Sequence, residues 1–176
     1  LAATRRRFRA RMDGVRRPSV GLALGSGAAR GRAQIGVLEV LFRSGIPVDV
    51  MVGCSRGAVI GGCYAAGMEA WELLEIGMSI DRREVFRRID LTVPNRGGLM
   101  SGAKMQALLE ELTEGKAFEE LRLPFACAAA DINTGEEVVI EDGLVHEAIR
   151  ASSSIPGVLQ PMMHGGRALV DGGILN

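Results

Sequence analysis

Residues 47–66, PVDVMVGCSRGAVIGGCYAA, decide the fold. Residues 47–53 form a short apolar run typical of a strand, and residues 58–66 are apolar all round, which predicts a buried helix. Between them, Gly53-Cys54-Ser55-Arg56-Gly57 fits the pattern G-x-S-x-G. A serine on a sharp strand-to-helix turn needs glycines on both sides, because the backbone folds tightly there. The pattern favours Ser55 as a nucleophile over an ordinary tight turn.

Apolar runs and helical stripes continue on both sides of this stretch. We expect further strands at residues 19–24, 125–130, 137–140 and 168–170, with the middle two paired across a turn at 133–135. We expect helices at residues 35–42, 69–78, 101–113 and 144–152, the third capped by Ser101, and a surface connection over 82–103. Strands that alternate with helices imply an α/β fold with a mainly parallel sheet covered on both faces.

A glycine-rich loop follows the first of these strands, and its residues are Gly25, Ser26, Gly27, Ala28, Ala29, Arg30 and Gly31. Such a loop can cradle a phosphate with backbone N–H groups. The dinucleotide pattern G-x-G-x-x-G fails here, because Arg30 occupies its last position. The other use is an oxyanion hole, in which backbone N–H groups and a cation meet the charge on a tetrahedral intermediate. We favour the oxyanion hole over nucleotide binding and over a simple packing turn.

Asp171 ends the last expected strand and is followed by two glycines. A carboxylate at the edge of the sheet that holds the serine turn could take the serine proton as a general base. Taken alone, Asp-Gly-Gly is more often a plain turn. Both histidines, His146 and His164, precede Asp171, whereas the α/β-hydrolase order Ser…Asp…His needs a histidine after it. We therefore expect His164 to be a turn residue.

Composition limits the remaining function classes. The 176 residues suit one domain, and the 21 basic and 21 acidic side chains give no evidence for nucleic-acid binding. Residues 1–18 form a basic lead-in with seven arginines, which we take as a solvated segment. The alternative for this lead-in is an electrostatic handle for anionic lipids. We expect residues 19–176 to form the domain, and we expect the chain to be a fragment truncated at its C-terminus.

The cysteines and the apolar segments bear on the location of the protein. Cys54, Cys63 and Cys127 match no zinc spacing and fit reduced thiols in a cytosolic protein. Apolar runs are too short to cross a bilayer, and no signal peptide is visible. We therefore expect a cytoplasmic protein, peripheral at the membrane if it acts on lipids. The sequence gives no indication of oligomeric state.

Five stretches together resemble one family, the bacterial patatin-like phospholipases, over residues 19–176. They are GLALGSGAARG, GCSRG, RGGLMSG, ASSSIPG (residues 151–157) and the closing DGG. The resemblance implies a three-layer α/β/α sandwich and a Ser–Asp dyad that hydrolyses lipid esters through an acyl-enzyme. It implies Ser55 as nucleophile and Asp171 as base, with the N–H groups around Gly27 and Ala28 beside Arg30 as the oxyanion site. It implies no metal and no organic cofactor.

Four positions depart from the family pattern. The family usually has glycine where Ser26 stands and often where Ala28 stands, and Gln34 takes a position often held by histidine. A small or apolar residue usually follows the nucleophile, whereas this chain has Arg56. One hypothesis is that Arg56 contacts substrate and favours anionic headgroups or carboxylated acyl chains, and the alternative is a side chain turned to solvent. These departures keep a rival open, namely a non-catalytic lipid-binding or regulatory module with the same fold.

Overall fold

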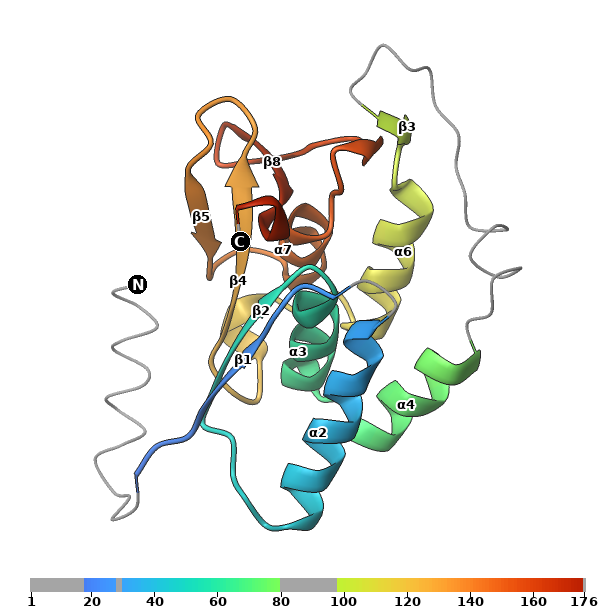
Figure 1. Cartoon of the computed structure of the whole chain (residues 1–176), viewed down its shortest axis with the longest axis vertical. Helices are drawn as coiled ribbons and strands as arrows, with labels where there is room; N and C mark the ends of the chain where they lie inside the picture. The colour runs from blue at the N-terminus through green and yellow to red at the C-terminus, as the bar shows by residue number, and fades with distance from the viewer. Residues whose placement is uncertain (1–17, 28–29, 80–97, 176) are drawn as a thin grey trace.

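The computed structural model describes residues 18–27, 30–79 and 98–175 (Figure 1). The basic lead-in and most of the expected connection over 82–103 lie outside these residues. The strands are β1 (Gly21–Leu24), β2 (Val50–Cys54), β3 (Gly98–Met100), β4 (Phe125–Asp131), β5 (Glu137–Ile140), β6 (Gly157–Leu159), β7 (Met162–His164) and β8 (Arg167–Asp171). The helices are η1 (Arg30–Arg32), α2 (Ala33–Arg43), α3 (Arg56–Ala66), α4 (Ala70–Ser79), α6 (Ala103–Leu112), η3 (Phe118–Glu120), α7 (Val145–Ser152) and η4 (Gly172–Ile174).

The main sheet has six strands in the order β1-β2-β4-β8-β7, with β5 also paired to β4. It is mixed rather than mainly parallel. β1, β2 and β4 are parallel, whereas β4 pairs antiparallel with β5 and β8, and β8 with β7. For two of these three antiparallel pairs the reason is the length of the connection. Residues 132–136 join β4 to β5 and residues 165–166 join β7 to β8, and such short loops join only antiparallel strands, whereas helices lie between the parallel strands.

Strands β2 and β8 lie end to end along one edge of β4. Ala128 pairs with Cys54 of β2 and with Val139 of β5, so β2 and β5 lie on opposite edges of β4. Ala129 pairs with Asp171 of β8 and also with β5, so β8 lies on the same edge as β2. Because β2 is parallel to β4 and β8 is antiparallel, their C-terminal ends meet head to head. This arrangement brings Ser55, which follows β2, to the last residue of β8.

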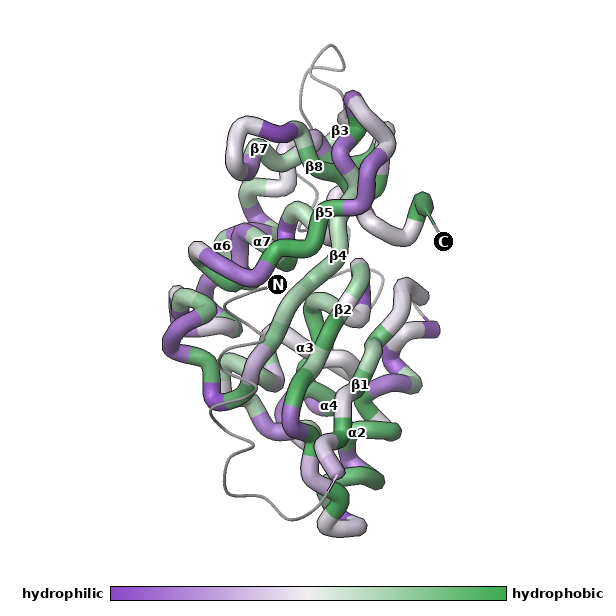
Figure 2. Tube along the Cα trace, turned by 90° about the vertical axis from the view of Figure 1, so that its left-hand side faces the viewer, coloured by the Kyte–Doolittle hydropathy of each residue, from purple (hydrophilic) through white to green (hydrophobic). Residues whose placement is uncertain are grey.

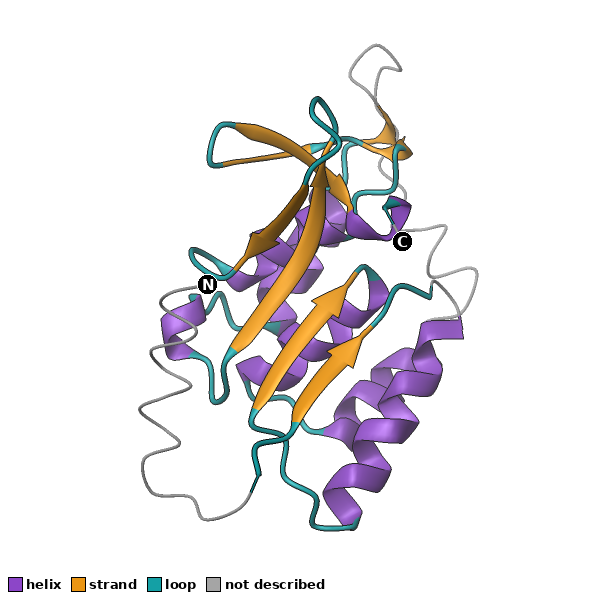
Figure 3. Ribbon diagram, turned by 60° about the vertical axis from the view of Figure 1, so that its left-hand side comes forward, coloured by secondary structure: helices purple, strands orange, loops and turns teal. Residues whose placement is uncertain are grey.

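The described helices pack on one face of the sheet, and Figure 3 shows the strands in front of them. Two glycines of α3 allow close contacts, Gly61 with this face of the sheet and Gly62 with helix α7. A Cβ on Gly61 would lie 3.1 Å from Met51 Sδ, and one on Gly62 would overlap Ile149. On the other face Val52 and Val139 are 42% and 41% exposed. The α/β class is confirmed, and the described residues form two of the three expected layers. In Figure 2 the apolar colour follows β2 and β4 through the middle of the fold.

Three local features differ from the expectations. β3 pairs in parallel with β6, although this part of the chain was expected to be a surface connection. His164 ends strand β7 instead of lying in a turn. The N-cap of α6 is Gly102, in the left-handed conformation, while Ser101 Oγ accepts a hydrogen bond from the N–H of Ala103. No helix within the described ranges combines the length and apolar character that a membrane span requires.

Candidate active site

Ser55 lies on the tight turn between β2 and α3. Its backbone has φ 54° and ψ −118°, a conformation that costs a non-glycine residue about 1–3 kcal/mol. Flanking glycines make the turn possible. A Cβ on Gly53 would lie 2.5 Å from the Ala58 Cα, and one on Gly57 would overlap the carbonyl of Leu24 at the end of β1. The predicted roles of both glycines as residues of a tight turn therefore fit their surroundings.

The side chains of Ser55 and Asp171 meet at the junction of β2 and β8. Ser55 Oγ donates a hydrogen bond of 2.5 Å to Asp171 Oδ2. The other carboxylate oxygen, Oδ1, accepts a hydrogen bond of 2.8 Å from the N–H of Gly173. Both side chains are buried. The carboxylate is thus held in one orientation, with one oxygen facing the serine hydroxyl.

The two glycines after Asp171 are required by contacts with other segments. A Cβ on Gly172 would lie 2.7 Å from the carbonyl oxygen of Ala128 in β4. A Cβ on Gly173 would lie 2.6 Å from Ser26 Oγ of the glycine-rich loop. The sequence Asp-Gly-Gly is therefore more than a turn, because it lets the end of β8 fit between β4 and this loop.

Three consecutive serines, the first of which ends α7, hold the backbone around Ser55 and Asp171. Ser152 Oγ accepts a hydrogen bond of 2.9 Å from the Ser55 N–H and donates one of 2.6 Å to the Ala128 carbonyl. Ser153 Oγ donates to the Ser55 carbonyl at 3.3 Å, and the Ser154 carbonyl accepts from the Asp171 N–H at 2.9 Å. The motif ASSSIPG is one of the five stretches that carry the family resemblance, but its sequence alone does not indicate this positioning role.

A buried arginine that the sequence analysis missed supports the same segment. Arg150 of α7 is 2% exposed and donates to Ser154 Oγ and to the carbonyls of Ser101 and Gln160, the latter two at 2.8 and 3.1 Å. A Cβ on Gly102 would overlap its guanidinium group. Arg150 therefore ties the segment before α6 and the residue after strand β6 to the last of the three serines. The spacing of a lone arginine in a helix carries no signal of such a role.

The glycine-rich loop lies beside the side chains of Ser55 and Asp171. The Gly25 carbonyl accepts a hydrogen bond of 2.8 Å from Gln34 Nε2, and the Gly31 N–H donates to the Gly27 carbonyl at 3.0 Å. The side chain of Ser26 lies against Gly173, two residues after Asp171. Arg30 begins η1 and is exposed, and Ala28 lies outside the described residues. The oxyanion role of this loop stays a prediction.

Other titratable side chains of the region are placed differently. Burial, together with the negative charge of Asp171, raises the pKa of the Cys54 thiol to about 11. This thiol is therefore neutral at pH 7 and a weak nucleophile beside Ser55. His164 is on strand β7, and its Nε2 lies 3.8 Å from Asp142 Oδ1. In the part of the chain that the structure describes, no group of three or more His, Cys, Asp or Glu side chains is arranged to hold a metal ion.

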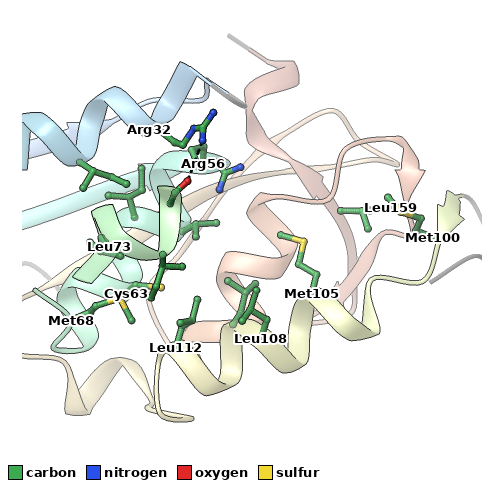
Figure 4. Close-up of a pocket in the computed structure, with 16 residues that line it drawn as sticks. Arg32, Arg56, Cys63, Met68, Leu73, Met100, Met105, Leu108, Leu112 and Leu159 are labelled. Atoms are coloured by element: carbon green, nitrogen blue, oxygen red, sulfur yellow. Dashed lines mark hydrogen bonds between the residues drawn. The ribbon is translucent and has the colours of Figure 1, made fainter. Parts of the chain in front are cut away.

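An apolar cavity of about 330 Å³ is lined in part by helix α3, which begins directly after Ser55 (Figure 4). Helices α3, α4 and α6 supply most of its walls, and Arg32 and Arg56 line it at one end. Arg56 is the residue after Ser55 and is half-buried, so its side chain is not simply turned to solvent. The structure thus places the predicted contact residue Arg56 at the cavity, while substrate contact itself stays a prediction.

Together, the fold and the site define a class of α/β proteins in which a buried serine on a strand-to-helix turn meets an aspartate. The chain belongs to the patatin-like phospholipase family, whose model matches residues 22–176. The predicted family is therefore confirmed.

Curated relatives agree with this assignment, and a solved structure shares the fold. An uncharacterized NTE family protein of Mycobacterium bovis is 38% identical over 94% of this chain and 46% of its own length. A lysophospholipase of Pyricularia oryzae is 33% identical over 90% of this chain and 11% of its own length. The crystal structure of VipD from Legionella pneumophila matches 90% of this chain and 46% of that chain, with a TM-score of 0.63 and 16% identity. The chain thus spans less than half the length of these proteins.

Proposed function

We propose that the protein is a serine acyl hydrolase that cleaves lipid ester bonds with Ser55 as nucleophile and Asp171 as general base. The observation that carries this proposal is the 2.5 Å hydrogen bond from Ser55 Oγ to Asp171 Oδ2 at a turn with positive φ. A nucleophile and its base must lie within hydrogen-bond reach of each other. The family and its lysophospholipase relative support a lipid as the substrate.

The reaction has two steps. In the first step Ser55 Oγ passes its proton to Asp171 and attacks the ester carbonyl carbon. The bond to the alcohol then breaks, and Asp171 returns the proton to the leaving oxygen, so that an acyl-enzyme remains. In the second step Asp171 takes a proton from water, the hydroxide attacks the acyl carbon, and Ser55 regains its proton as the acid leaves. The Gly173 N–H orients the carboxylate throughout.

The negative charge on the reacting carbonyl oxygen needs stabilisation. We assign this role to the backbone N–H groups around Gly27 and Ala28 with Arg30 beside them. The N-terminal end of α3, which begins directly after Ser55, adds the positive end of a helix dipole. Gln34 supports the loop through the Gly25 carbonyl. Part of the proposal is that the protein works at the surface of a membrane, because its lipid substrates are found there.

Labelling with a fluorophosphonate probe tests the proposal. We expect the wild-type protein to be labelled, and Ser55→Ala to lose the label. Ser44→Ala serves as the matched control, since Ser44 is exposed at the C-terminal end of α2, which lies at the opposite end of the fold from the turn between β2 and α3 (Figure 1). Hydrolysis of a lysophospholipid should follow the same pattern. A full-length protein that folds but neither takes the label nor hydrolyses esters would instead support the non-catalytic lipid-binding module.

A further inference from the structure

The apolar cavity beside the site has a size and lining suited to an alkyl chain. Its volume of about 330 Å³ falls within the range of small-molecule sites, roughly 300–1,000 Å³. Val59 of α3 and Leu108 and Leu112 of α6 form walls on two sides, and Figure 4 shows the leucines directed toward the space between the helices. Apart from the end where the arginines lie, the walls are almost entirely apolar.

Two guanidinium groups line one end of this cavity. Arg32 Nη1 donates a hydrogen bond of 3.1 Å to the Gly77 carbonyl, which fixes its side chain beside α4. Arg56 comes from the first turn of α3, and its stem passes over Gly31. A Cβ on Gly31 would lie 2.9 Å from the Arg56 Cβ and closer still to its Cγ. The glycine-rich loop thus leaves room for Arg56 to reach the cavity, and Figure 4 shows both arginines at the same end.

The electrostatics of this end favour an anion. Burial, and next the positive charge of Arg32, lower the pKa of Arg56. Both causes mean that the surroundings disfavour the charged guanidinium, one by desolvation and the other by like-charge repulsion. A carboxylate or phosphate between the two groups would offset both effects and accept charge-assisted hydrogen bonds.

We infer that this cavity binds an amphiphile with a single alkyl chain and an anionic end. The chain lies among Val59, Leu108 and Leu112, and its carboxylate or phosphate binds between Arg32 and Arg56. Because Arg56 follows Ser55 directly, the anionic end lies on the side of the cavity nearest the nucleophile. The inference deepens the proposed function. It rests on that function only where it identifies this amphiphile as a substrate or a product. Binding itself requires no turnover.

Calorimetric titration of the full chain carrying Ser55→Ala, which removes hydrolysis, tests this inference. Four probes are compared below their micellar concentrations: dodecanoate, dodecyl phosphate, dodecanol and inorganic phosphate. We expect the two anionic amphiphiles to bind, dodecanol to bind more weakly, and inorganic phosphate not to compete. The tighter of the two anionic probes identifies the source of the anion, a fatty acid or a lipid phosphate.

Variants of both ends of the cavity sharpen the test. Arg56→Gln and Arg32→Gln should each weaken the anionic amphiphiles about tenfold and leave dodecanol unchanged. Arg56→Lys should keep most of the affinity, because it keeps the charge. Arg43→Gln is the matched control, since Arg43 is an exposed residue of α2 paired with Glu39. Leu108→Trp fills the cavity and should abolish binding of all three alkyl probes.

The inference is overturned if Arg56→Gln and Arg43→Gln bind dodecanoate and dodecyl phosphate equally, or if Leu108→Trp still binds them. It is also overturned if inorganic phosphate competes as well as the amphiphiles do. Thermal unfolding of each variant shows that it is folded before it is titrated. Failure of the proposed function is a separate result, namely binding by Ser55→Ala without any ester hydrolysis by the wild-type protein.

Discussion

The junction of β2 and β8 and the adjoining cavity are built in opposite ways. At the junction, backbone segments approach so closely that glycines are required, and hydrogen bonds with Ser152, Ser153 and Gly173 fix Ser55 and Asp171. The cavity has side chains for walls, with few polar atoms apart from the ends of Arg32 and Arg56. The difference indicates that the backbone positions the chemistry, whereas side chains that can be exchanged set which molecule is accepted.

Replacement of Asp171 by Asn should separate the two regions most strongly. The amide cannot take the serine proton, so kcat should fall by about 10²–10⁴-fold. Dodecanoate should still bind in the cavity, because no wall of the cavity changes. Ester hydrolysis and calorimetric titration of the same preparation check both parts. Retained hydrolysis with Asn at this position would show that Asp171 is not the base.

A methyl group at Gly57 should break the close backbone approach at the junction. The Cβ of Gly57→Ala would overlap the Leu24 carbonyl, so we expect the free energy of unfolding to fall by about 1–3 kcal/mol or more. Gly36→Ala is the matched control, since Gly36 is also helical and a Cβ there meets nothing within 4 Å. That change should stabilise α2 by about 0.5–1 kcal/mol. Urea unfolding measures both, and equal effects would contradict the steric argument.

How far the sequence predicts this molecule differs between the same two regions. The strand, turn and helix around Ser55 were predictable, because the glycines and the apolar pattern are local signals. The meeting of Ser55 with Asp171 was expected at one edge of a parallel sheet, but it arises from an antiparallel strand that meets β2 end to end. Local patterns do not encode which edge of β4 a later strand will join.

The supporting groups and the cavity were not predictable for a related reason. The roles of Ser152 and Arg150 depend on contacts with residues about 50 to 100 positions earlier, for which a single sequence gives no signal. The cavity is formed where helices separated in the sequence leave space between them. Arg56 was singled out only as a departure from the family pattern, and the position of Arg32 beside it required the folded chain.

Removal of one serine hydroxyl should test how tightly the junction is fixed. Ser152→Ala leaves the Ser55 N–H and the Ala128 carbonyl without their shared partner. The free energy of unfolding should therefore fall by about 1–3 kcal/mol, and kcat should fall about tenfold. Ser153→Ala is the graded comparison, because Ser153 makes one longer bond, of 3.3 Å, to the Ser55 carbonyl. Its effect on kcat should be smaller. The reverse order would contradict the positioning role of Ser152.

Truncation in the cavity should change selectivity with little change in the chemistry. Leu108→Ala enlarges the space beside Val59, so esters with longer acyl chains should gain a few-fold in kcat/KM relative to shorter ones. Hydrolysis of a short-chain ester should keep its kcat, because the contacts around Ser55 remain. A series of esters that differ only in acyl length measures this preference. An equal loss for every ester would show that the cavity supports the fold and does not accept the acyl chain.

The two cysteines nearest to these regions offer the smallest and most local test. Burial and then the charge of Asp171 raise the pKa of Cys54 to about 11, whereas burial alone raises that of Cys63, in the cavity wall, to about 12. Removing a negative charge favours the thiolate, so Asp171→Asn should lower the pKa of Cys54 and leave that of Cys63 unchanged. Alkylation by iodoacetamide, followed peptide by peptide between pH 8 and 10, should therefore become faster at Cys54 only, because the thiolate is the reactive form. An equal acceleration at Cys63 would mean that the variant has loosened the whole fold, so that the junction and the cavity are not independent.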